Sequence, residues 1–170
     1  MSNAEPASLA DFRSPSHSST LHQIKAWFQK AVPFPNDVNI GTQIGVHIEE
    51  ISEMFAPLKD AALNQETNDQ VQFFHDVLLH AQKCFKTHQR SFQLDYRHLD
   101  RLAVLDALCD QIVTAVGVAH MLEMDIEGAL QEVARSNDSK FDHNGEPIFN
   151  SGQKIMKGPN YFPPELAQFV

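Results

Sequence analysis

Two groups of acidic residues occupy stretches with a helical pattern. The first group is Glu49, Glu50 and Glu53, within GVHIEEISEMFAPL, and the second is Asp106 and Asp110, within the apolar stretch LAVLDALCDQIVTAVGVAHML. Carboxylates one turn apart lie on the same face of a helix. Carboxylates that face one another repel unless a cation lies between them. Because hard cations such as Mg²⁺ prefer oxygen ligands and bridge to phosphates, the two groups suggest metal-dependent phosphate chemistry inside a helical bundle.

The stretch that carries the three glutamates also has an apolar stripe. At about 100° per residue around a helix, the glutamates fall on the side opposite this stripe. That position favours a solvated acidic face over a metal site. The stripe consists of Ile44, Ile48, Ile51, Phe55 and Leu58.

The second acidic group is harder to explain as surface charge. Asp106 and Asp110 are the only formally charged residues between positions 103 and 122. Aspartate is a poor helix former and is rarely buried without a partner. The two aspartates therefore either bind a cation or pair with a basic side chain such as Arg97 or Arg101, and periodicity leaves both alternatives open.

The composition fits a single soluble domain. The chain has 170 residues, 42% of them hydrophobic, which is enough for a core. A formal net charge of -9 argues against binding a nucleic-acid backbone. Cys84 and Cys109 lie in apolar helical stretches, where we expect reduced core thiols. No uninterrupted apolar run approaches the ~20 residues of a membrane span, and no signal-peptide pattern is visible, so we expect a cytoplasmic protein without a membrane partner.

The elements that must position these residues are predicted to be helical. We predict an all-α fold, a helical bundle of four to five helices with an extended C-terminal arm. Residues 1–18 are predicted to form a flexible tail, 19–138 the helical domain and 139–170 the arm, with a short hairpin around HNGEPIFNSGQKIM. The predicted helices run from Ser19 or Thr20 to Ala31, over 42–58 with Thr42 as cap, over 68–88, over 96–122, and over 125–136 with Asp125 as cap.

The order of the acidic motifs resembles the all-α NTP pyrophosphohydrolases, which include MazG-like proteins, phosphoribosyl-ATP pyrophosphohydrolases and dimeric dUTPases. Glu49, Glu50 and Glu53 match the family's E-E-x-x-E motif. The family's second motif is usually E-x-x-D, and Asp110 matches its aspartate. Position 107 is alanine here, and Asp106 is the nearest substitute for the missing glutamate, which leaves the number of metal ions open.

The C-terminal part of the chain resembles the phage and bacterial MazG-like members. Those proteins carry Asn-x-Ser-Lys at the end of the last helix and a later Lys-Gly-Pro segment. The resemblance covers roughly residues 20 to 166. The matching residues are Asn137, Ser139, Lys140, Lys157, Gly158 and Pro159.

The resemblance implies an enzyme that hydrolyses nucleoside triphosphates to monophosphates and pyrophosphate. It implies Mg²⁺, replaceable by Mn²⁺, and a homodimer or homotetramer. Glu49 or Glu50 would be the catalytic base. The implied metal ligands are Glu49, Glu50, Glu53, Asp106 and Asp110.

The resemblance also suggests substrate-binding residues. Trp27 would stack on the base, Asn137 would bind base or sugar, and Lys140, Lys157 and Tyr161 would contact the phosphates. Each has a plainer alternative: Trp27 in the core, Asn137 as a helix C-cap and Lys140 as an ordinary surface lysine. The alternative for the whole chain is a non-catalytic helical interaction module with a degenerate metal site.

Overall fold

The computed structural model describes residues 19–87 and 92–170, and its fold is all-α, as predicted. The described residues contain no β-strand; Phe149 and Ile155 form an isolated antiparallel bridge inside the predicted hairpin. The predicted N-terminal tail, residues 1–18, lies outside the described residues. The helices are α1 (Thr20–Ala31), α2 (Asp37–Asp60), α3 (Gln65–Thr87), α4 (Arg101–Met121) and α5 (Ile126–Asp138), with short 3-10 helices η2 (Tyr96–His98) and η3 (Leu166–Phe169).

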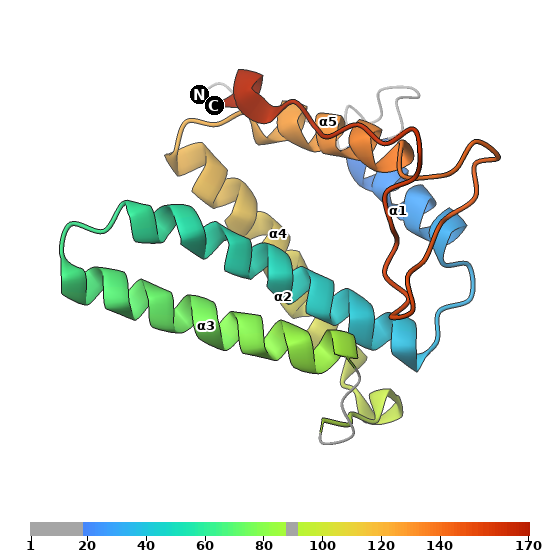
Figure 1. The fold of residues 1–170 in the computed structure, drawn as a ribbon, viewed down its shortest axis with the longest axis horizontal. Coiled ribbons are helices and arrows are strands. Elements are labelled where there is room, and N and C mark those ends of the chain that lie inside the picture. Colours follow the sequence, from blue (N-terminus) through green and yellow to red (C-terminus); the bar gives the residue numbers. More distant parts are fainter. Residues whose placement is uncertain (1–18, 88–91) are drawn as a thin grey trace, which may run out of the picture.

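The helices form two pairs that α4 connects (Figure 1). Helices α2 and α3 pack as a long antiparallel hairpin, and α1 packs against α5. After α5 the chain runs out as the arm, contacts the start of α2, and returns along α5. The return is fixed near the beginning of α5, where the backbone N–H of Asp125 donates to the carbonyl of Phe169 over 2.9 Å.

Local capping explains where three of the helices begin. Ser19 caps α1 and Asp125 caps α5, both as predicted. Asp100 caps α4 by accepting hydrogen bonds from the backbone N–H groups of Leu102 and Ala103. The predicted start of this helix at position 96 is therefore wrong, because residues 96–98 form the separate helix η2.

Helix α2 begins five residues earlier than predicted. Asn36 and Asn39 form a reciprocal capping box that starts the helix at Asp37. Thr42, predicted as the cap, is buried inside the helix, and its Oγ1 donates to the carbonyl of Gly152 in the arm over 2.8 Å. Residues 37–41, predicted as loop, are therefore helical.

Helix α3 also begins earlier than predicted. It starts at Gln65, and the Asn64 side chain accepts a hydrogen bond from the backbone N–H of Thr67. The predicted end of this helix, position 88, lies outside the described residues.

The buried residues of α2 are small, and one of them, Gly45, lies at the contact with α3. Gly41, Gly45 and Ser52 of α2 are buried, whereas the predicted apolar stripe lies half-buried and Leu58 is 48% exposed. A Cβ at Gly45 would lie 2.7 Å from Cγ of Lys86, so glycine permits the close approach of α3. Glu49, one turn after Gly45, lies on this packed face, so its predicted position opposite the core is wrong.

Helix α4 has few apolar neighbours in the single chain. Ala119 is its buried residue, while Leu102, Leu105 and Val113 are 78%, 59% and 68% exposed. Cys109 is exposed on α4, unlike the buried Cys84, so the expectation of two core thiols is wrong for Cys109.

By length and composition alone, α4 could cross a membrane. It has 21 residues, with a mean hydropathy of 1.7 in its most apolar window. The core helix of a soluble protein passes the same criterion. The sequence did not indicate this, because Asp106 and Asp110 interrupt the apolar run.

Candidate functional site

Glu49 joins three parts of the fold. Its carboxylate forms ion pairs with Lys86 of α3 and with Lys154 of the arm, the latter over 2.9 Å. The three side chains are 22%, 18% and 42% exposed, respectively. Burial alone would raise the pKa of Glu49, but the hydrogen bonds from Lys86 and Lys154 lower it below its ordinary value. A carboxylate predicted as metal ligand or base is thus paired with two ammonium groups.

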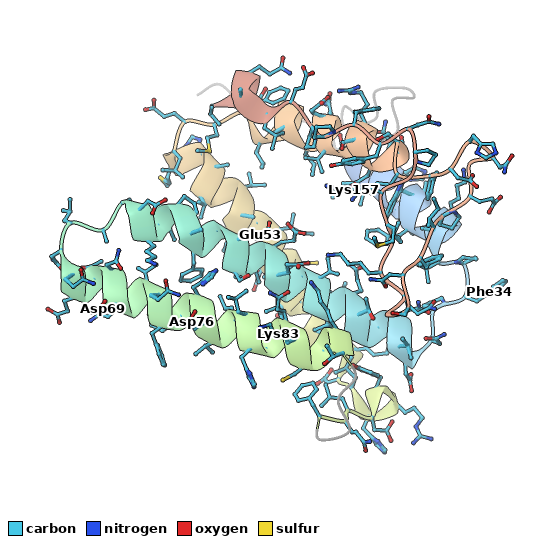
Figure 2. All side chains as sticks on the ribbon, in the orientation of Figure 1. Phe34, Glu53, Asp69, Asp76, Lys83 and Lys157 are labelled. Carbon is cyan, nitrogen blue, oxygen red and sulfur yellow. The ribbon has the colours of Figure 1, made fainter. Side chains whose placement is uncertain are left out.

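Glu50 and Glu53 lie on the adjoining, exposed side of α2, where Figure 2 labels Glu53. The pKa of Glu50 is raised, first because neighbouring protein removes part of its hydration, and then because the carboxylates of Glu53 and Glu49 repel its charge. Lys154 and Lys140 oppose this shift. Glu50 and Glu53 therefore place two negative charges close together on α2, and a cation would reduce their repulsion.

The two aspartates of α4 do not form a cluster with the three glutamates of α2. Asp106 and Asp110 are exposed, and Arg97, considered as their partner, pairs with Asp95 over 2.7 Å. The side chains of His47 on α2 and Gln111 on α4 contact each other. His47 lies one turn before Glu50, and Gln111 directly follows Asp110, so the two acidic stretches approach each other here. Within residues 19–87 and 92–170, no three His, Cys, Asp or Glu side chains form a group that could hold a metal ion.

The arm brings the two C-terminal motifs together. A Cβ at Gly158 would lie 2.6 Å from the carbonyl oxygen of Lys140, so glycine lets the arm cross the backbone after α5. Nζ of Lys157 lies 4.5 Å from the ring centroid of Tyr161. Lys140 is half-buried, and its pKa is lowered, chiefly by this burial; Tyr161 and Glu50 oppose the shift, whereas Lys157 and Lys154 add to it. Figure 2 labels Lys157 on the arm.

Trp27 and Asn137 meet, but by a contact within the protein. Trp27 Nε1 donates to the backbone carbonyl of Asn137 over 2.9 Å, and its ring stacks on Phe141 with centroids 5.5 Å apart. Nζ of Lys140 lies 5.9 Å from the Trp27 ring centroid. Asn137 belongs to the last turn of α5, and its carbonyl also accepts from the backbone N–H of Lys140. The five substrate-binding candidates thus lie on α1, on the end of α5 and on the arm that packs against them.

Lys86 and Lys154 were missed by the sequence analysis. The predicted hairpin around Lys154 placed this lysine near a turn, and the Phe149–Ile155 bridge agrees with that hairpin. Nothing in the sequence connects Lys154 with Glu49, which lies 105 positions away. Only the path of the arm across α2 and α3 creates the cluster.

Comparison with known proteins shows the fold. No protein-family model matches the chain, and no curated protein shows significant similarity to it. Its structure is similar to the crystal structure of a "putative NTP pyrophosphohydrolase" from Exiguobacterium sp. 255-15, with a TM-score of 0.55 and 20% sequence identity. The similarity covers 86% of this chain and 89% of that one, so the two proteins share the fold over most of their length.

Proposed function

We propose that this chain is a Mg²⁺-dependent nucleoside triphosphate pyrophosphohydrolase, which converts NTP or dNTP to the monophosphate and pyrophosphate. The observation that carries the proposal is the meeting of acidic and basic groups around Glu50. Glu53 and Glu49 act on Glu50 from α2, and Lys154 and Lys140 act on it from the arm and the end of α5. A metal–triphosphate needs both kinds of group, carboxylates for the cation and ammonium groups for the phosphates. The fold shared with the Exiguobacterium protein supports the proposal.

The carboxylates of α2 suit a hard cation. Mg²⁺ is commonly held by one or two carboxylates together with substrate phosphates, and Mn²⁺ accepts the same oxygen ligands. Glu53 would hold the cation, and Asp110 or Asp106 would join it from α4. When bound, the cation neutralises phosphate charge and lowers the pKa of coordinated water.

Glu50 is better suited than Glu49 to act as the general base. Two ammonium groups already pair with the Glu49 carboxylate. The charges that act most strongly on Glu50 are instead the carboxylates of Glu53 and Glu49. Glu50 would accept the proton of the attacking water. Its raised pKa supports this role, since a base works best when its pKa approaches the operating pH.

The arm would supply the contacts to the phosphates. Lys140, Lys157 and Tyr161 lie together where the arm crosses the end of α5. Their two ammonium groups and one phenol can bind phosphate oxygens. Trp27 and Asn137 would contact base or sugar through groups that their mutual hydrogen bond does not use, the face of the indole and the side-chain amide.

The exposed face of α4 suggests that the active form contains a second copy of the chain. An apolar helix this exposed is unusual for a soluble monomer. The α3 surface adds an open hollow of about 690 Å³ beside the exposed Phe73 and Phe74. A homodimer or homotetramer would cover these faces and could complete the acidic site by closing α4 on it.

The test is pyrophosphate release from a panel of canonical and modified nucleoside triphosphates, with Mg²⁺ and with EDTA. We expect metal-dependent release of equal amounts of pyrophosphate and monophosphate. The absence of a gathered metal group among the described residues favours one competing function, a helical interaction module with a degenerate site. That function predicts no release from any substrate and no effect of Mg²⁺ on thermal stability.

A further inference from the structure

The arm carries a lysine, Lys154, that acts on the proposed base but has no substrate contact assigned in the proposed function. Lys154 lies in the turn that the Phe149–Ile155 bridge closes. Asn150 holds this turn twice: its backbone N–H donates to the carbonyl of Lys154 over 3.0 Å, and its side chain accepts from the backbone N–H of Lys154 over 2.9 Å. These hydrogen bonds fix the backbone of Lys154 independently of the contacts that its side chain makes.

The turn is attached to α2 at two places. Thr42 Oγ1 donates to the Gly152 carbonyl, and two turns later along α2 the Glu49 carboxylate pairs with Lys154. Lys86, held beside Gly45 by the close packing of α3, reaches the same carboxylate. One carboxylate and two ammonium groups leave one net positive charge at this point.

Further positive charge lies nearby. Lys140 interacts electrostatically with both Lys154 and Lys157, and Lys154 also acts on Glu50. Lys154 of the arm and Lys140 just after α5 thus act on the proposed base, and Lys86 of α3 pairs with the neighbouring Glu49. Converging ammonium groups are stabilised by an anion with several negative oxygens, such as a triphosphate.

The same ion pairs make Glu49 a poor ligand for a cation. A metal ion would have to displace two ammonium groups, of which Lys86 is only 18% exposed. Leaving a largely buried ammonium without its partner is unfavourable. The geometry instead suits a carboxylate that positions lysines.

We propose that Lys154 contacts the triphosphate of the substrate, and that Glu49 is a positioning residue that holds Lys154 beside Glu50 instead of binding the metal ion. This inference rests on the proposed function, because it concerns the same site. It differs from the ligand set expected from the acidic motif, in which Glu49 binds metal.

Two binding measurements without turnover test the inference. The first is the affinity for inorganic triphosphate in EDTA, followed through Trp27, the single tryptophan of the chain, or by calorimetry. The second is the affinity for Mn²⁺ alone, followed by electron paramagnetic resonance. Neither measurement requires a nucleotide to be hydrolysed.

Lys154→Gln should weaken triphosphate binding about tenfold and leave Mn²⁺ affinity within twofold of wild type. Lys154→Arg should bind triphosphate nearly as well as wild type. The matched control is Lys83→Gln on the exposed part of α3, which changes charge equally and should change neither affinity. Wild-type triphosphate binding by Lys154→Gln, or equal loss in Lys154→Arg, would overturn the phosphate contact.

Glu49→Gln should weaken triphosphate binding severalfold and keep Mn²⁺ affinity, whereas Glu53→Gln should lose Mn²⁺ affinity. Equal loss of Mn²⁺ affinity in both variants would overturn the positioning role. If wild type binds triphosphate through Lys154 but releases no pyrophosphate, the inference holds and the proposed enzyme function fails. If wild type does not bind triphosphate, the inference fails whatever the turnover.

Discussion

The indole N–H of Trp27 donates to the backbone carbonyl of Asn137 over 2.9 Å, joining α1 to the last turn of α5. Trp27→Phe keeps an aromatic ring against Phe141 and removes this donor. We expect a loss of about 1 kcal/mol in unfolding free energy, the usual value of one such hydrogen bond. Urea unfolding followed by circular dichroism measures it.

Comparing Trp27→Phe with Trp27→Ala tests whether the Trp27 ring binds the nucleotide base or only packs in the core. If the ring stacks on the nucleotide base, Trp27→Phe should keep KM for the best substrate within a few fold, and Trp27→Ala should raise it markedly. An unchanged KM in a folded Trp27→Ala protein would show that this ring serves the core alone.

The helix ends show which structural features are local enough to be predicted. Ser19 and Asp125 were predicted as caps because a cap depends on residue type and on the next three residues. The stretch ending at Gly41 was predicted as a loop but is the start of α2, and Gly45 is a glycine where α3 approaches closely. The approaching part of α3 lies about 40 positions further along the chain, where a local pattern cannot show it.

The candidate site shows the same division. The spacing of Glu49, Glu50 and Glu53 predicted that they share one helix, which they do. Their different surroundings were not predictable, because Lys86 and Lys154 reach Glu49 from α3 and from the arm. Glutamates of one motif thus differ in pKa and in their partners because of contacts with distant parts of the chain.

Glu53→Gln tests the proposed cation ligand. The change removes a charge from an exposed position on α2, so the fold should be retained. We expect turnover to fall by at least about 10²-fold, because losing a residue that merely orients a metal ligand already costs about 10- to 100-fold. The control is Glu66→Gln, an equal change in the first turn of α3. Full turnover by Glu53→Gln, with Mg²⁺ still required, would remove Glu53 from the site.

Gly158→Ala tests whether the crossing of the arm is needed. The added methyl group would lie 2.6 Å from one backbone carbonyl oxygen and 2.7 Å from the next, at Lys140 and Phe141. Overpacking of this kind costs about 1–3 kcal/mol, so the arm should become sensitive to limited proteolysis. Gly117→Ala on α4 is the control, because its methyl group would meet nothing within 4 Å. Equal protease resistance of both variants would contradict the role of Gly158.

The returning C-terminal segment should loosen in acid. The Arg135 guanidinium, and then the backbone N–H of Glu165, hold the pKa of Glu132 at about 2. Because this pKa is below the unfolded value of 4.5, the stabilisation is fully present above pH 4.5 and is lost as the pH falls toward 2. The protection of the Glu165 amide against hydrogen exchange, measured relative to the intrinsic rate at each pH, should therefore fall as the pH is lowered from 5 to 2.5. In Glu132→Gln this extra pH dependence should vanish, and its persistence would assign the effect to another group.

The exposed face of α4 gives the last prediction. Leu102 and Val113 lie on one side of the helix, three turns apart, and are 78% and 68% exposed. If a second copy covers this face, wild type should be at least a dimer in light scattering. The double variant Leu102→Glu, Val113→Glu should be monomeric, because burying two carboxylates at an apolar contact is unfavourable. Leu63→Glu, in the turn between α2 and α3 and 98% exposed, is the matched control and should assemble as wild type does. A monomeric wild type would contradict the assembly itself, and a double variant that still forms the wild-type oligomer would place the contact on another face.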